Sequence, residues 1–325
     1  MWFCVLRTQT LTRQSHFFLL SLIPKFPQLT NIQDRCQQLK TKKLKGICEL
    51  YKFETELKES HIFPKFVVNY HKKTGSKYFR KPTESNKRLQ DAIKLYLLSE
   101  RAEQEFSIRE KWFAENMFYP FHKGKRELEY NQDLYYFTIS FLWRVLKLNL
   151  RNENLKDRWY YSKLIVAENE WREYLTNGVF PKTCNNNFLY FTHYIGENTT
   201  SIERVYSYLL RTFDATIITE KENSLIIYGK FNQFMFWSVL KANVSDFPPM
   251  DCYINPNGGK FKIPQNNFFQ YRVLNGFLGN RIQGINNLIN PSEKQQEKIL
   301  KEIMKNPKEW LESDTGKSII KYGRK

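Results

Sequence analysis

A dense run of apolar residues in the middle of the chain limits the folds open to it. Between residues 131 and 148, apolar side chains recur so closely that the segment is typical of a helix buried on most sides. A second run between residues 155 and 175 repeats its apolar residues at roughly helical spacing, and Gly178 stands where a helix would end. We therefore expect a helical region over residues 121–180.

Residues 187–242 change to a β-type pattern. Four segments are rich in β-branched and aromatic residues, namely 188–194, 213–219, 225–230 and 234–240. Turn candidates at Asn223-Ser224 and Phe231-Asn232 separate the last three segments. This pattern predicts a small antiparallel sheet within a C-terminal region that covers residues 181–325.

The N-terminal third of the chain is less regular. Residues 1–42 show little periodicity and are interpreted as a weakly ordered leader or a misplaced start. Residues 43–120 are expected to contain short strands at 47–53 and 62–68. They should continue as a helix through Leu89 and Leu98 and a second helix that Pro120 stops. A closing helix is expected after Pro291, with Ser292 as its cap.

The net charge is strongly positive. The chain has 51 Lys and Arg residues against 33 Asp and Glu residues, which gives a formal charge of +18. Such a surplus attracts nucleic acid, phosphate-rich ligands or anionic membrane surfaces. The joint abundance of Lys, Asn, Ile, Phe and Tyr has a second explanation, since these residues also accumulate when the coding DNA is rich in A and T. Both explanations stay open at this point.

Cysteine usage and hydropathy favour a cytoplasmic protein. The five cysteines are an odd number and no two are close in sequence, so they predict reduced thiols rather than a disulfide framework. The apolar run over residues 17–23 is too short to span a bilayer, and no small-residue cleavage site follows it. We expect no membrane partner, whereas a protein partner stays possible.

One segment carries a family resemblance. It comprises KGICELYKFETELKESHIFPKFV over residues 45–67 and LLSERAEQEF over residues 97–106. These motifs resemble a group of bacterial HNH-related proteins, whose members typically show a CxxC pair, a Ser-His-Ile-Ile-Pro-Lys-Phe motif and a second Cys-x-x-Cys that opens a helix. The resemblance covers roughly a quarter of the chain. It implies a ββα finger, in which a histidine activates water to attack a phosphodiester beside a divalent metal.

Residue by residue, the resemblance transfers only in part. His61 matches the general base and Glu103 falls near the last metal ligand, where it could bind Mg²⁺ or Mn²⁺ through oxygen. The four zinc positions are occupied by Cys48, Tyr51, Ser99 and Ala102, so no structural zinc site is expected. Each of the two residues also has a purely structural interpretation. His61 could be a partly buried structural histidine, and Glu103 could belong to a solvated helix face.

The sequence thus predicts an α+β protein. An N-terminal HNH-like ββα unit leads into a helical middle, and a small antiparallel sheet with a closing helix follows. A basic loop is expected to contact DNA or RNA phosphates through Lys65, Lys72, Lys73, Lys77 and Arg80. We expect an endonuclease-like protein that acts on or binds nucleic acid. The sequence leaves open whether it still catalyses cleavage. The alternatives are nucleic-acid binding without turnover and a protein-interaction subunit.

Overall fold

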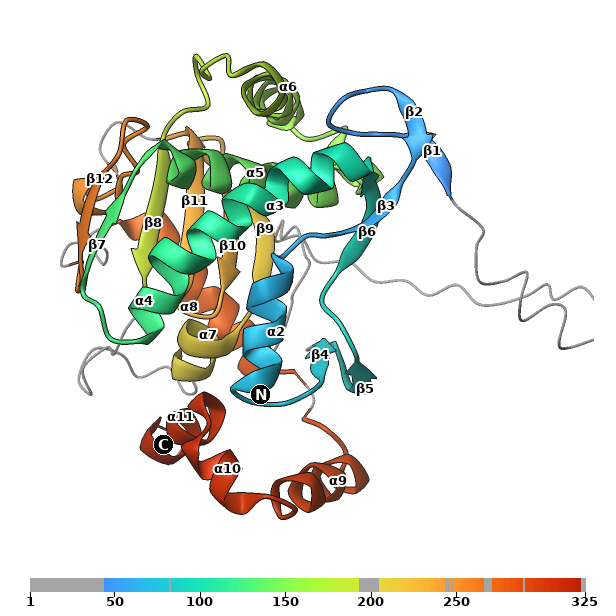
Figure 1. The fold of residues 1–325 in the computed structure, drawn as a ribbon, viewed down its shortest axis with the longest axis vertical. Helices are drawn as coiled ribbons and strands as arrows, with labels where there is room; N and C mark the ends of the chain where they lie inside the picture. Colours follow the sequence, from blue (N-terminus) through green and yellow to red (C-terminus); the bar gives the residue numbers. More distant parts are fainter. Residues whose placement is uncertain are drawn as a thin grey trace, which may run out of the picture.

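A four-stranded antiparallel sheet lies at the centre of the protein, between helices on both faces (Figure 1). The computed structural model describes residues 44–81, 83–192, 205–242, 246, 248–265, 271–288 and 290–322. The expected leader over residues 1–42 lies outside this part of the chain. The fold is mixed α+β, as the sequence predicted. Within the described ranges, no helix combines the length and the apolar character that a membrane span requires.

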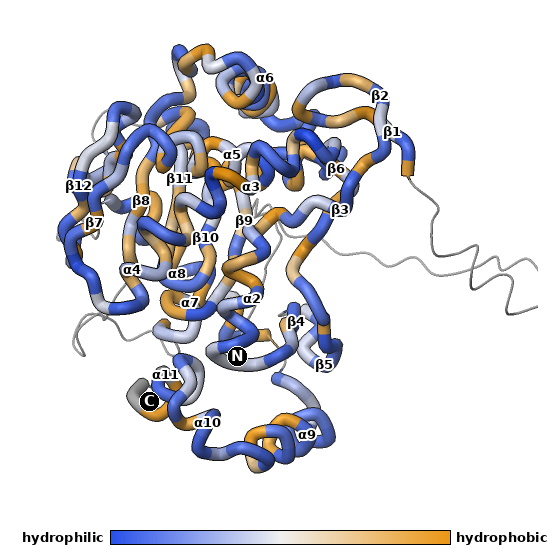
Figure 2. The backbone as a smooth tube through the Cα atoms, viewed as in Figure 1, coloured by the Kyte–Doolittle hydropathy of each residue, from blue (hydrophilic) through white to orange (hydrophobic). Residues whose placement is uncertain are grey.

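The central sheet confirms the predicted strands. Its strands are β8 (Asn187–Phe191), β9 (Asp214–Glu220), β10 (Ser224–Phe231) and β11 (Phe234–Lys241). Their order in the sheet is β8-β11-β10-β9, and every pairing is antiparallel. Strands β9 to β11 form consecutive hairpins, while β8 pairs with β11. Figure 2 shows hydrophobic residues concentrated in these strands.

Alternate side chains of the sheet enter two different apolar cores. Helix α5 (Gln132–Asn149) covers one face, where it packs with Leu225 and Ile227 of β10. On the other face, Ile226 and Tyr228 pack with α8 (Arg272–Asn286) and α7 (Val205–Arg211). Because both faces are covered, β10 is buried along its whole length.

The three regions expected over residues 43–325 share one core. The cluster around α5 contains buried residues from Cys48 to Ile263. Helices α3 (Glu100–Phe113) and α6 (Tyr161–Asn177) both pack against α5, and α6 ends at Gly178 with a positive φ of 71°. Strand β7 (Glu127–Tyr130) pairs with β12 (Gly259–Lys262), which joins the helical middle to the C-terminal region.

Three expectations for the N-terminal region are wrong. Strands β1 (Lys45–Ile47), β2 (Glu54–Glu56) and β3 (Lys58–His61) are present, but neither 47–53 nor 62–68 is a strand, because residues 48–53 form the turn between β1 and β2. Pro64 instead caps the start of α2 (Lys65–Lys73), a helix that buries Val67 and Val68. The helix expected through Leu89 and Leu98 is replaced by β5 (Glu84–Leu89) and β6 (Lys94–Leu98), because pairing of β5 with β4 and of β6 with β3 overrides the helical spacing.

The helical segment after β6 also runs further than expected. From α3 it continues through a π-helical turn, Ala114–Phe118, into α4 (Tyr119–His122). Pro120 does not stop it: this proline lies in α4, directly after the π-helical turn, and the segment ends two residues later at His122.

The C-terminal helices extend across the lower part of the molecule in Figure 1. The closing helix is confirmed as α9 (Glu293–Ile303), with Ser292 at the cap position. Two further helices that the sequence did not indicate follow it, α10 (Pro307–Glu312) and α11 (Asp314–Tyr322). They reach back towards the N-terminal region, where Tyr70 of α2 donates a 2.9 Å hydrogen bond to Asp314. The hairpin of β4 (Phe79–Lys81) and β5 lies beside α9 and connects to it through Asn86, which accepts from the backbone of Ser292 at 2.8 Å.

Candidate functional site

His61 ends a strand that belongs to a two-stranded antiparallel pair. Strand β3 pairs with β6, and in this register His61 lies opposite Lys94. After β6 the chain enters α3, which carries Glu103 in its first turn. Helix α2 and the β4–β5 hairpin are inserted between the two strands (Figure 1). Strands β3 and β6 and helix α3 thus lie together around His61, but α2 and the hairpin separate the two strands in sequence.

The side chain of His61 lies next to a carboxylate. Its Nε2 atom is 3.2 Å from Oδ2 of Asp91, and 18% of the histidine side chain is exposed to solvent. Asp91 also forms a 2.8 Å ion pair with Lys94. Sequence reasoning missed Asp91, because its segment was expected to be helical and the pairing of β6 with β3 is a long-range contact.

The surroundings keep His61 neutral at pH 7. Burial lowers the pKa of His61 below its ordinary value of 6.5, and this effect outweighs the opposing charge and hydrogen bond of Asp91. Glu103 raises the same pKa through its charge, so its carboxylate acts on the imidazole through space. A neutral imidazole has a lone pair with which it can accept a proton.

Asp91 remains ionised beside the imidazole. Partial burial would raise its pKa, but the hydrogen bonds from Lys94 and His61 lower the pKa overall. The backbone N–H of Ala92 donates a 2.9 Å hydrogen bond to Oδ1 of Asp91, which lowers this pKa further and fixes the carboxylate. The site therefore combines a neutral proton acceptor with an ordered anion.

A buried arginine holds the backbone at His61. Arg144, in the middle of α5, donates from Nη1 to the carbonyl oxygen of His61 at 2.9 Å. The same atom forms a 2.8 Å ion pair with Glu110 of α3. Because only 4% of the Arg144 side chain is exposed, these bonds form in a medium of low polarity and fix the end of β3 firmly to two helices.

The four positions expected to match zinc ligands lie where β1, β2 and α3 meet. The backbone N–H of Ser99 donates to Sγ of Cys48 at 3.3 Å, and Oγ of Ser99 accepts from the backbone N–H of Ala102 at the same distance. Tyr51 instead bonds through its hydroxyl to Glu105. Hydrogen bonds and packing thus hold this corner together without a set of four sulfur ligands.

The residues expected to contact phosphate divide into two groups. Lys65, Lys73 and Lys77 are exposed, and Lys72 is half-buried over the ring of Phe79. Arg80 is only 4% exposed, and its Nη1 atom donates to the carbonyl of Ser85 at 2.8 Å. Arg80 therefore supports the β4–β5 hairpin, and the exposed basic surface consists of the lysines.

Metal ligands around His61 are few. No group of three or more His, Cys, Asp or Glu side chains that could hold a metal ion is found in the described ranges. His61 and Asp91 could supply two ligands, which falls short of the three or more that catalytic zinc sites use. The residues present do not fit a metal held by protein ligands alone. The chemistry that they support is proton transfer at His61.

The fold and the site together define a mixed α+β protein with a histidine–aspartate pair at the end of a two-stranded sheet. No family model matches the chain, and comparison with curated proteins and with solved structures gives no match.

Proposed function

We propose that this chain is a nucleic-acid-directed phosphodiesterase of HNH ancestry in which His61 acts as the general base. The observation that carries the proposal is the contact between a neutral, partly exposed imidazole and the carboxylate of Asp91. The position of His61 at a strand end, with the helix of Glu103 following β6, supports the same lineage.

The pair suggests a simple proton transfer. When Nε2–H of His61 donates to Asp91, the other ring nitrogen, Nδ1, keeps its lone pair. Nδ1 then takes a proton from a water molecule as that water attacks the phosphorus of a phosphodiester; one P–O ester bond breaks, and the leaving sugar oxygen takes a proton from solvent. The negative charge of Asp91 stabilises the imidazolium that forms, as a carboxylate does beside other catalytic histidines.

The lysines near this corner supply the binding surface. Lys65 begins α2 four residues after His61, Lys73 ends that helix, and Lys77 lies in the segment that follows it. Each contact with a phosphate releases a counterion, so binding should weaken steeply as salt is added. The buried, unpaired thiols of Cys48, Cys184 and Cys252 suit a reducing, cytoplasmic setting.

A cleavage assay tests the proposal. Supercoiled plasmid and single-stranded RNA are incubated with the full chain in Mg²⁺, Mn²⁺ and Ni²⁺. We expect cleavage that is lost in His61→Ala and reduced in Asp91→Asn. An exposed aspartate elsewhere, Asp157, provides the matched control Asp157→Asn, which should cleave normally. Absence of cleavage by the native chain, or equal cleavage by His61→Ala, would refute catalysis.

A second candidate is nucleic-acid binding without turnover. It is favoured by Ser60, which precedes His61 where an acid that binds metal is common, and by the lack of a three-ligand group in the described part of the chain. Salt-dependent retention of DNA or RNA by both the native chain and His61→Ala, with no cleavage, would select this function. A chain that retains neither nucleic acid would leave the role of a protein-interaction subunit.

A further inference from the structure

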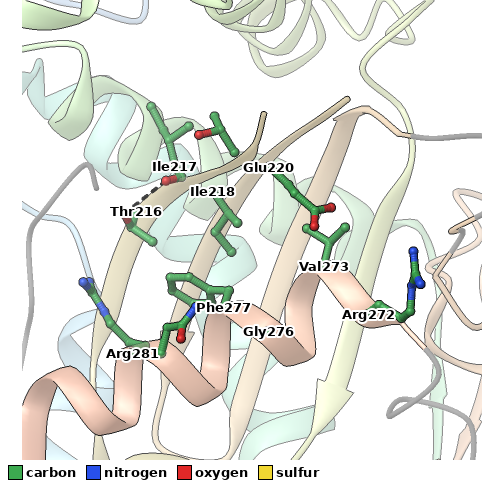
Figure 3. A pocket seen from close by; sticks show the side chains of 11 residues that line it. Thr216, Ile217, Ile218, Glu220, Arg272, Val273, Gly276, Phe277 and Arg281 are labelled. Carbon is green, nitrogen blue, oxygen red and sulfur yellow. Dashed lines mark hydrogen bonds between the residues drawn. The ribbon is translucent and has the colours of Figure 1, made fainter. Parts of the chain in front are cut away.

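A C-terminal arm lies against the hairpin that follows the basic helix α2. The arm consists of α9, α10 and α11, and Figure 1 shows these helices as a curved row below α2 and the β4–β5 hairpin. It starts from α8, which Figure 3 shows alongside β9. Arg281 of α8 binds the carboxylate of Asp214 in β9 with two bonds of 2.7 and 2.8 Å. The arm therefore has a firm starting point on the central sheet.

The far end of the arm is fixed to α2 and α7. Asp314, at the start of α11, accepts a 2.9 Å hydrogen bond from Tyr70 and forms a 3.7 Å ion pair with Arg211 of α7. The backbone N–H of Thr315 donates to the carbonyl of Thr74 at 3.3 Å, and Thr315 is buried. The arm is thus attached at both ends, with α9 and α10 between them.

The middle of the arm is held loosely. Helices α9 and α10, which the structure describes in full, bury no side chain completely. Leu300 and Met304, on adjacent turns of α9, are 59% and 64% exposed. Little apolar surface is therefore removed from water where α9 meets the hairpin. Segments with so few buried contacts open at a low free energy.

The contacts between α9 and the hairpin are polar and centre on Arg88 of β5. Nη1 of Arg88 lies 2.6 Å from Oε1 of Glu302, and both side chains are partly exposed. With its amide oxygen turned towards the hairpin, Gln295 accepts from Arg88 Nε at 3.2 Å and from Arg80 Nη2 at 2.7 Å. Because water competes for exposed ion pairs, such a contact contributes little stability.

Arg88 lies at the edge of the exposed lysine surface. Its guanidinium stacks over the ring of Tyr78, 4.8 Å from the ring centre, and Tyr78 directly follows the exposed Lys77. A planar guanidinium binds two oxygens of a phosphate as well as it binds the two oxygens of a carboxylate. Glu302 therefore occupies a position in which a phosphate would bind.

We propose that Arg88 is a phosphate-binding residue that Glu302 keeps occupied, so that α9 acts as an autoinhibitory strap. When nucleic acid binds, a phosphate replaces the carboxylate of Glu302, and α9 leaves the hairpin while both ends of the arm stay attached. The strap lowers the affinity in proportion to the fraction of molecules that are open. The choice of nucleic acid as the anion rests on the proposed function, whereas the movement of α9 does not.

Two glutamates of α9 provide a matched pair of variants. Glu302 pairs with Arg88, whereas Glu297 is exposed and its side chain forms no hydrogen bond or ion pair within the described part of the chain. Gln at either position removes one negative charge from the same helix. The general effect of charge on nucleic-acid binding is therefore the same in both variants. Only Glu302→Gln releases the guanidinium of Arg88.

A second variant loosens the arm without a change in charge. Gly75 lies where α11 meets α2, and a Cβ atom there would collide with Oγ1 of Thr315 and lie 2.6 Å from Nη2 of Arg211. Gly75→Ala should therefore dislodge the far end of the arm. Gly284→Ala is the control, because a Cβ atom on Gly284 would meet nothing within 4 Å.

Movement and binding are measured separately on the full chain, with His61→Ala in every variant to prevent cleavage. Without nucleic acid, the amides of α9 should exchange hydrogen ~10-fold faster in Glu302→Gln than in Glu297→Gln. Glu302→Gln should also bind a labelled duplex DNA ~10-fold more tightly than Glu297→Gln, as expected if about a tenth of the molecules are open before release.

The other variants test how the gain arises. Gly75→Ala should bind the duplex more tightly than Gly284→Ala does. Addition of Arg88→Gln to Glu302→Gln should abolish the gain and lower the logarithmic salt slope by roughly 0.9, the value for one phosphate contact.

Three results would overturn the proposal. These are equal exchange of α9 in Glu302→Gln and Glu297→Gln, equal affinities of these two variants for DNA, and a gain that survives Arg88→Gln. Failure of every variant to bind DNA or RNA would overturn the phosphate at Arg88 together with the proposed function. Absence of cleavage by the native chain, alongside the expected gain in affinity, would refute catalysis at His61 and support the strap.

Discussion

Arg144 in the central helix α5 holds the carbonyl oxygen of His61, 83 residues earlier in the chain, through a 2.9 Å hydrogen bond from Nη1. This bond links the candidate base directly to the buried core. Since the same guanidinium pairs with Glu110, one side chain fixes β3, α3 and α5 with respect to one another. The position of the imidazole thus depends on the packing of helices that are remote in sequence.

Removing this guanidinium should therefore destabilise the protein. In Arg144→Met, Glu110 and the His61 carbonyl lose their shared partner, and breaking a buried ion pair typically costs about 3–5 kcal/mol. We expect a loss of about 3 kcal/mol in the free energy of unfolding, measured by urea denaturation. The control is Arg151→Gln, because Arg151 is exposed and donates to the carbonyl of Tyr96 at 3.3 Å. A loss as small as that of the control would contradict the role of Arg144.

The titration of His61 should follow its contact with Asp91. Because Asp91 raises the pKa of His61 against the larger effect of burial, Asp91→Asn should lower this pKa further below 6.5. NMR titration of the ring C–H signals measures it directly. If His61 is the base, the acidic limb of the cleavage profile should move to lower pH as well. A pKa that rises in Asp91→Asn would show that the carboxylate does not act on the imidazole.

The lowered pKa of His61 also makes the stability of the protein depend on pH. The pKa of His61 is lowered on folding, so below pH 6.5 the unfolded chain binds more protons than the folded protein does. The stabilising contribution is present above the unfolded pKa and is lost as the pH falls towards the folded value. Compared with the native chain, His61→Gln should lose less stability between pH 7 and pH 5, measured by urea denaturation at each pH.

Ser99 should matter as a helix cap. Its Oγ atom accepts from the backbone N–H of Ala102 at the start of α3, and its own N–H donates to Cys48. Ser99→Ala should lower the free energy of unfolding by about 1 kcal/mol, the usual effect of losing such a cap. Ser107→Ala, on the exposed surface of the same helix, is the control and should have little effect. Equal effects of the two variants would argue against the cap.

Exposed and buried basic residues should have different effects on nucleic-acid binding. Lys73 and Lys77 are exposed, so the double variant Lys73→Gln/Lys77→Gln should reduce the salt dependence of nucleic-acid binding by roughly 2 in the logarithmic slope, if both touch phosphate. Arg80→Gln should leave the slope unchanged and lower the melting temperature, because its guanidinium supports the β4–β5 hairpin. If Arg80→Gln instead reduced the salt-dependence slope of nucleic-acid binding, Arg80 would belong to the binding surface.

Gly229 should tolerate no side chain. A Cβ atom at this position of β10 would lie 2.6 Å from the ring of Phe141, which packs across the strand from α5. Gly229→Ala should therefore destabilise the protein by about 1–3 kcal/mol through overpacking. Gly284→Ala has open space and should stabilise α8 slightly. Equal melting temperatures of the two variants would contradict this close approach.

The sequence alone determined the elements whose local pattern admits one structure. Helices α5 and α6 were predicted because their apolar residues persist over several turns and Gly178 marks an end. Strands β9, β10 and β11 were predicted from β-branched and aromatic runs divided by short turns. His61 was singled out by its motif.

Only the tertiary structure decided which distant groups meet. Asp91 lies 30 residues from His61 and Arg144 lies 83 residues from it, so no local spacing could reveal either partner. Leu89, Ile93 and Leu97 carry a helical spacing, yet pairing of β5 with β4 and of β6 with β3 made this segment extended, since tertiary contacts can outweigh local propensity. Strand β9 and α8 lie side by side only because α8 returns from later in the chain to pack on the sheet. Local preferences fix elements, but the packing of elements creates sites.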